Sequence, residues 1–117
     1  TRDGMVLRGE ITYVDTFGNI ETSIGRLRWV GPALIELPPD PSGAQSASVD
    51  AQVLAARLPK SAQQPLPGLH HTYGDVKEGE LFALISSGGY LEISCNRASA
   101  AERTGARVGD PVELILE

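Results

Sequence analysis

Glycine and proline cut this chain into short segments, and that division limits the possible folds more than any other feature. The 117 residues contain 13 glycines and 8 prolines, which favour turns and therefore short strands. Strands do not alternate with long helices in this sequence, so the pattern that would indicate parallel βαβ units is absent. We therefore predict an all-β fold, a Greek-key sandwich or a closed Greek-key β-barrel, with one short helix near the C-terminus. We favour the barrel, because closure removes the sheet edges that such strands would otherwise expose.

The first half of the chain predicts a hairpin followed by less regular strands. Alternation along Met5–Val14 predicts a strand with Ile11 and Tyr13 on the same face. The Gly18-Asn19 pair before Ile20–Ile24 predicts a hairpin turn with positive φ, where Asp15 accepts backbone hydrogen bonds. For Val49–Leu58 a strand and a helical turn are both compatible with the pattern, and we favour the strand. Further strands are expected at Leu81–Ile85, Tyr90–Cys95 and Val112–Leu116. Another is expected at Trp29–Leu37, where the interruption at Gly31-Pro32 is compatible with a bulge or with a turn that enters the strand.

The stretch Ser86–Ala101 joins three features that together could form a ledge for a small ligand. It opens with small residues, Ser-Ser-Gly-Gly, continues as an alternating strand, and ends at a helix start. Ser99 with Glu102 three residues later predicts a capping box, and Gly105 is placed to end the helix. An ordinary strand-turn-helix corner is the alternative interpretation of the same pattern.

Length and charge limit the class of protein. We expect one domain over residues 1–117, in which residues 38–68 form Pro-, Ser- and Gln-rich loops around one strand. The net charge of −5 argues against a protein that binds the phosphate backbone of nucleic acid. No apolar run is long enough to span a membrane, and one cysteine excludes an internal disulfide, so we expect a cytoplasmic protein.

Two segments together resemble one enzyme family. The first runs from Gly9 to Thr22 and contains Asp15-Thr16-Phe17-Gly18-Asn19; the second runs from Thr72 to Ala101 and contains Ser86-Ser87-Gly88-Gly89-Tyr90. In this order they resemble the S-adenosylmethionine hydroxide adenosyltransferases, relatives of the fluorinating and chlorinating enzymes. The resemblance is to the C-terminal domain only, which implies a closed β-barrel. The α/β catalytic N-terminal domain is absent from these residues, and since the chain begins at Thr1 we expect that residues preceded it.

The resemblance implies a substrate and a set of contacts. The family's active site lies between subunits of a homotrimer, so this chain would bind the adenine and methionine ends of S-adenosylmethionine and lack a catalytic residue of its own. Asn19 matches the residue that bonds adenine, Phe17 a residue that lines the pocket, and Ser87 one that holds the methionine carboxylate. The backbone at Arg97 and Ala98 would also reach adenine.

Three departures point to the branch of the family that uses water. Gly88 and Cys95 stand where the halogenating relatives carry arginines, and Ser23 replaces a common asparagine. The implied reaction is hydrolysis of S-adenosylmethionine to adenosine and methionine, with the compound as substrate and no separate cofactor. Cys95 is expected to pack as a small apolar residue. No metal site is expected, because His70 and His71 are adjacent on a predicted strand and should face opposite ways.

Three other functions are compatible with a small barrel. One is a free-standing ligand-binding module without catalysis, and another is a structural assembly domain. The third, an oligonucleotide-binding barrel, is disfavoured by the aromatic content of 5% and the negative charge, since such barrels stack bases on aromatic side chains in a basic groove.

Overall fold

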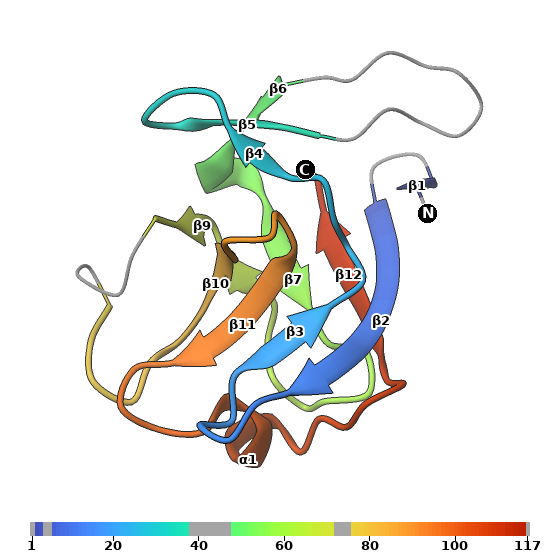
Figure 1. Cartoon of the computed structure of the whole chain (residues 1–117), viewed down its shortest axis with the longest axis vertical. Helices are drawn as coiled ribbons and strands as arrows, with labels where there is room; N and C mark the ends of the chain where they lie inside the picture. Colours follow the sequence, from blue (N-terminus) through green and yellow to red (C-terminus); the bar gives the residue numbers. More distant parts are fainter. Residues whose placement is uncertain (1, 4–5, 38–47, 72–75, 117) are drawn as a thin grey trace.

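The computed structural model describes residues 2–3, 6–37, 48–71 and 76–116, and nearly all of its regular structure is β (Figure 1). One 3-10 helix, η1 (Ala51–Val53), and one α-helix, α1 (Ala100–Thr104), interrupt the strands. The strands are β1 (Arg2–Asp3), β2 (Val6–Val14), β3 (Ile20–Thr22), β4 (Arg28–Trp29), β5 (Leu34–Glu36), β6 (Ser48–Asp50), β7 (Ala55–Arg57), β8 (Leu66–Pro67), β9 (Leu69–His70), β10 (Leu81–Ile85), β11 (Leu91–Cys95) and β12 (Pro111–Ile115).

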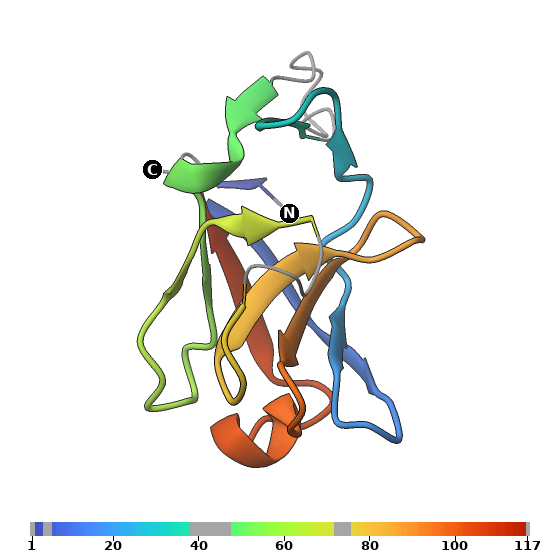
Figure 2. The ribbon, with the colours of Figure 1, turned by 90° about the vertical axis from the view of Figure 1, so that its left-hand side faces the viewer.

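The main sheet curls into a nearly closed barrel, as the sequence predicted. Its strands follow the order β8-β7-β12-β2-β3-β11-β10-β9, with β1 paired to β2. The two ends of this order, β8 and β9, are consecutive in the chain and meet at Gly68, whose φ is 73°. A positive φ of this kind suits glycine, which has no Cβ to clash. Figure 2 shows the barrel from the side, with α1 beneath one end.

A second, three-stranded sheet lies at the barrel end away from α1 (Figure 1) and differs from the prediction. Trp29–Leu37 was expected to be one interrupted strand, but Gly31-Pro32 lies in a turn between β4 and β5, which pair antiparallel. Val49–Leu58 is likewise divided among β6, η1 and β7. Asp50 caps η1 by accepting a hydrogen bond from the N–H of Gln52. The predicted loop over residues 38–47 lies outside the described residues.

The core fills the barrel interior, and one bulge changes the predicted side of a residue. Ile11, Ile20, Ile93 and Leu114 are buried inside the barrel with most of the other aliphatic side chains. The β2–β3 register shifts between Ile11 and Tyr13, which leaves Tyr13 54% exposed instead of sharing the buried face of Ile11. An extra residue in one strand reverses the alternation beyond it. No helix among the described residues has the length and apolar character needed to cross a membrane.

Candidate functional site

The turn between β2 and β3 is organised by one carboxylate. Asp15 Oδ1 accepts hydrogen bonds of 2.9 Å from the backbone N–H groups of Phe17 and Asn19. Asp15 Oδ2 accepts a third, of 3.0 Å, from Nδ2 of Asn19. Gly18 lies at the centre of the turn with φ of 84°, as the Gly-Asn pair predicted. The predicted role of Asp15 as a backbone acceptor is therefore confirmed.

Hydrogen bonds set the pKa of Asp15. Burial acts to raise it, but the combined bonds from the backbone and side chain of Asn19 and from the backbone of Phe17 and Gly18 outweigh burial. The net result is a pKa below the usual value of 3.8, because these donors favour the charged carboxylate. The Asp15 side chain is therefore an ionised carboxylate at neutral pH.

The start of α1 packs against this turn. Ser99 is the N-cap and accepts a bond of 3.1 Å from Glu102 N–H, which is one half of the predicted capping box. Gly105 ends the helix at φ of 72°, as predicted. The N–H of Ala101 donates 3.0 Å to the carbonyl oxygen of Gly18. A Cβ on Gly18 would lie 1.9 Å from Ser99 Oγ, so only glycine allows this approach.

The connection from β11 to α1 forms the opposite side of the site. Its residues turn tightly, with Ala98 N–H donating 3.2 Å to the carbonyl of Cys95. Arg97 has φ of 60°, in the left-handed region that residues with a Cβ seldom occupy. Such strain, roughly 1 kcal/mol or more, persists where surrounding structure imposes it, and it often accompanies ligand sites.

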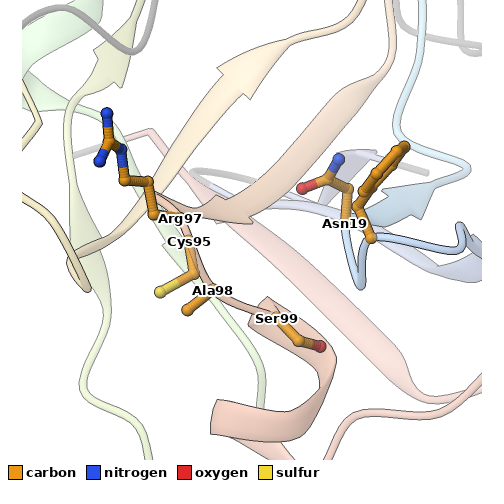
Figure 3. A pocket seen from close by; sticks show the side chains of 6 residues that line it. Asn19, Cys95, Arg97, Ala98 and Ser99 are labelled. Carbon is orange, nitrogen blue, oxygen red and sulfur yellow. The ribbon is translucent and has the colours of Figure 1, made fainter.

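The β2–β3 turn and the β11–α1 connection line an open pocket of about 530 Å³ (Figure 3). Its lining residues come from the β2–β3 turn and from the β11–α1 connection: Phe17, Asn19, Cys95, Arg97, Ala98 and Ser99. The structure therefore brings Phe17, Asn19, Arg97 and Ala98 together, although the two pairs are far apart in sequence. Cys95 is buried, as expected of a small apolar residue, yet it also contributes to this lining. Ser99 had been predicted only as a helix cap.

Ser87 lies apart from this pocket. It occupies the turn between β10 and β11, is exposed, and is not among the pocket's lining residues. Ser86 shapes that turn, with Oγ accepting a 3.2 Å bond from Tyr90 N–H. The whole of β11, five residues or roughly 16 Å of strand, separates the turn from the pocket. A ligand in contact with both would have to be elongated.

The carboxylates of Glu21 and Glu92 lie on the strands between the Ser87 turn and the pocket. Glu92 of β11 is directly opposite Glu21 of β3. Burial raises the pKa of Glu92 most; the 3.0 Å bond from Ser94 Oγ lowers it, and the charges of Glu21 and Asp15 raise it again. The net pKa of Glu92 lies above 4.5.

The two histidines contact aromatic rings. His71 stacks on Trp29 with ring centroids 3.5 Å apart, and His71 Nε2 lies 3.0 Å from the carbonyl oxygen of Pro32. His70 meets Phe82 edge to face at 5.7 Å. Within the described ranges, no group of three His, Cys, Asp or Glu side chains is arranged to hold a metal ion.

Comparison with known sequences assigns the family. The family model described as "SAM hydroxide adenosyltransferase C-terminal domain" matches residues 9–113, which is most of the chain and includes both segments that form the pocket. The chain belongs to this family.

One curated protein and two solved structures are similar to this chain. A (R)-S-adenosyl-L-methionine hydrolase of Thermus thermophilus is 43% identical over 47 residues, covering 40% of this chain and 18% of that protein. A crystal structure of an uncharacterized conserved protein from Thermotoga maritima matches 97% of this chain and 37% of its own, with a TM-score of 0.65 and 23% identity. A crystal structure of a conserved hypothetical protein from Thermus thermophilus matches 92% of this chain and 34% of its own, with a TM-score of 0.59 and 27% identity. This chain therefore spans well under half the length of these relatives.

Proposed function

We propose that this SAM hydroxide adenosyltransferase domain binds the adenine end of S-adenosylmethionine. The proposed adenine pocket is the one between the β2–β3 turn and the β11–α1 connection, which Asn19 lines. The observation that carries the proposal is the convergence of Phe17 and Asn19 with Arg97 and Ala98 around one cavity. An amide offers a donor and an acceptor side by side, which suits the edge of adenine, and an exposed phenyl ring can pack on a planar base. The strained backbone of Arg97 supports a binding role for the opposite wall.

The complete enzyme, in this proposal, hydrolyses S-adenosylmethionine to adenosine and methionine. Water attacks the ribose C5′ carbon, the C–S bond breaks with its electron pair staying on the sulfur of methionine, and the attacking water loses one proton to solvent to leave the 5′-hydroxyl of adenosine. The sulfonium is already a good leaving group, so positioning and partial desolvation of the water provide the main acceleration. This domain contributes the positioning of the substrate, with Ser87 as the proposed contact of the methionine carboxylate, one strand length from the adenine pocket.

We propose further that another domain closes the pocket. Phe17 lines the pocket yet is 79% exposed, so its ring is not covered from outside by the described residues. In the proposed homotrimer, the N-terminal domain of a neighbouring subunit would cover this side and supply the catalytic groups. A cytoplasmic location is the accompanying proposal, since a single cysteine cannot form an internal disulfide.

Calorimetric titration of the complete polypeptide with S-adenosylmethionine and adenosine tests the proposal, with Asn19→Ala as the variant. We expect binding by the natural protein and at least about fivefold weaker binding of both ligands by the variant, since a bidentate contact to a base contributes about 1–3 kcal/mol. Assay of adenosine release from S-adenosylmethionine tests the reaction. Absence of adenosine binding up to millimolar concentration would reject the adenine pocket and favour a structural assembly domain.

A further inference from the structure

The two oxygens of the Asp15 carboxylate have separate partners. Oδ1 accepts hydrogen bonds from two backbone N–H groups of the turn, those of Phe17 and Asn19. Oδ2 accepts a hydrogen bond of 3.0 Å from Nδ2 of the Asn19 side-chain amide. One oxygen therefore shapes the backbone, and the other holds the side chain that faces the pocket.

This contact fixes which end of the Asn19 amide faces the pocket. An ionised carboxylate only accepts hydrogen bonds, so a reversed amide would place Oδ1 of Asn19 against Oδ2 of Asp15, and the two oxygens would repel each other. The amide is thus held with Nδ2 toward Asp15. Figure 3 shows its oxygen directed toward the side of the pocket where Cys95, Arg97 and Ala98 lie.

We propose that Asp15 is a positioning residue that makes the pocket select 6-aminopurines over 6-oxopurines. The inference rests on the proposed function, in which Asn19 contacts the base. The 6-amino group of adenine donates to the Asn19 oxygen, while the remaining Nδ2 hydrogen donates to a ring nitrogen beside it. Hypoxanthine and guanine carry an acceptor oxygen at the same place, which the Asn19 oxygen repels.

The variant Asp15→Asn separates the two duties of the carboxylate. An amide oxygen at the place of Oδ1 still accepts both backbone bonds, but an NH₂ group replaces Oδ2. That group donates, so the Asn19 amide turns its oxygen to residue 15 and its NH₂ group to the pocket. A pocket that presents donors favours the 6-oxo group over the 6-amino group.

Titration of the complete polypeptide with adenosine and inosine tests the inference. We expect the natural protein to bind adenosine roughly 10 to 100 times more tightly than inosine, the range of one bidentate base contact. We expect Asp15→Asn to lower this ratio at least tenfold or to invert it. A purely structural role of Asp15 would weaken both ligands together and leave the ratio unchanged, which would overturn the inference.

Two further variants keep the test decisive. Asp15→Ser retains an acceptor for the backbone but loses Oδ2, the atom that orients the Asn19 amide. The ratio of adenosine affinity to inosine affinity should therefore move toward one, and this result is available even if Asp15→Asn unfolds. Asp50→Asn is the matched control, because Asp50 also caps a backbone N–H but lies outside the pocket lining, and its ratio should equal that of the natural protein. A natural protein that binds adenosine and inosine equally overturns the inference alone, whereas one that binds neither rejects the proposed function and the inference with it.

Discussion

The carbonyl oxygen of Gly18 accepts a hydrogen bond of 3.0 Å from the backbone N–H of Ala101, which joins the β2–β3 turn to the first turn of α1. Both sides of the pocket depend on this junction, because Phe17 and Asn19 flank Gly18 and Ser99 precedes α1. The two partners come from opposite ends of the sequence. The contact therefore sets the shape of the site through tertiary packing and not through local structure.

Replacing Gly18 by alanine tests this junction. The variant places a Cβ 1.9 Å from Ser99 Oγ and 2.8 Å from Ser99 Cα, and it also strains a φ of 84°. We expect a loss of about 2–4 kcal/mol in the free energy of unfolding, measured by urea denaturation, together with loss of adenosine binding. Gly109→Ala is the matched control, since φ is 94° there but no atom of the described residues, apart from the two chain neighbours, lies within 4 Å of the added Cβ. It should lose only about 1 kcal/mol, and an equally mild effect at Gly18 would contradict the close packing.

Removing the Asp15 carboxylate should cost stability in a pH-dependent way. Asp15→Ala leaves three donors without their acceptor, and we expect the free energy of unfolding to fall by about 1–2 kcal/mol at pH 7. The pKa of Asp15 is lowered in the folded state, so its stabilisation is complete above 3.8 and is lost as pH falls through the folded pKa. Urea denaturation from pH 2 to 7 should show the two proteins converging only in acid. A difference that stays constant down to pH 2 would argue against a carboxylate-based contribution.

The sequence was sufficient for the features that depend on neighbouring residues. The Asp15–Asn19 turn, the Ser99 cap and the Gly105 helix end were all predicted, because side chains within a few residues of one another determine them. The side of Tyr13 was predicted wrongly, because the bulge in β2 depends on its pairing with β3. The β4–β5 hairpin was missed because Gly31-Pro32 fits a bulge as well as a turn.

The candidate site was also predicted only in part from the sequence. Phe17, Asn19, Arg97 and Ala98 were named from motif resemblance, and the barrel brings them together. Cys95 has no polar signal that would mark it as a pocket residue, and Ser99 carries a signal already explained by capping. The separation of Ser87 from Arg97 and Ala98 follows from the predicted strand between them, whereas its separation from Phe17 and Asn19 could not be predicted, because it depends on the pairing of β11 with β3.

Replacing Ser87 by alanine separates the two ends of the proposed ligand. Because Ser87 is a strand length from the adenine pocket, we expect adenosine affinity to stay within about twofold of the natural value. The affinity for S-adenosylmethionine should fall about tenfold, the usual effect of losing one hydrogen bond to a charged group. Calorimetric titration measures both, with Asn19→Ala as the comparison that weakens both ligands. Unchanged affinity for S-adenosylmethionine would remove Ser87 from the binding site.

Neutralising Glu92 should stabilise the protein at neutral pH. Its pKa is raised in the fold, so ionisation disfavours the folded state, and stability decreases as pH rises from 4.5 through the folded pKa. Glu92→Gln keeps an oxygen for Ser94 and removes the repulsion from Glu21, so we expect a gain of about 0.5 kcal/mol at pH 7 that disappears below 4.5. Thermal melts over pH 3–8 measure this gain. Destabilisation at pH 7 would indicate that the amide cannot replace the carboxylate as the partner of Ser94.

Thr22 offers a test of the barrel interior. Its side chain is 2% exposed, and its hydroxyl donates 2.8 Å to the carbonyl of Leu91 and accepts 3.2 Å from Ile24 N–H. Thr22→Val preserves the shape but leaves both backbone groups without this partner, so we expect a loss of about 2–3 kcal/mol in urea denaturation. Thr22→Ser keeps the hydroxyl and removes one methyl group, which should cost only about 1 kcal/mol. If valine is tolerated better than serine, burial of the methyl group outweighs the two hydrogen bonds of the Thr22 hydroxyl.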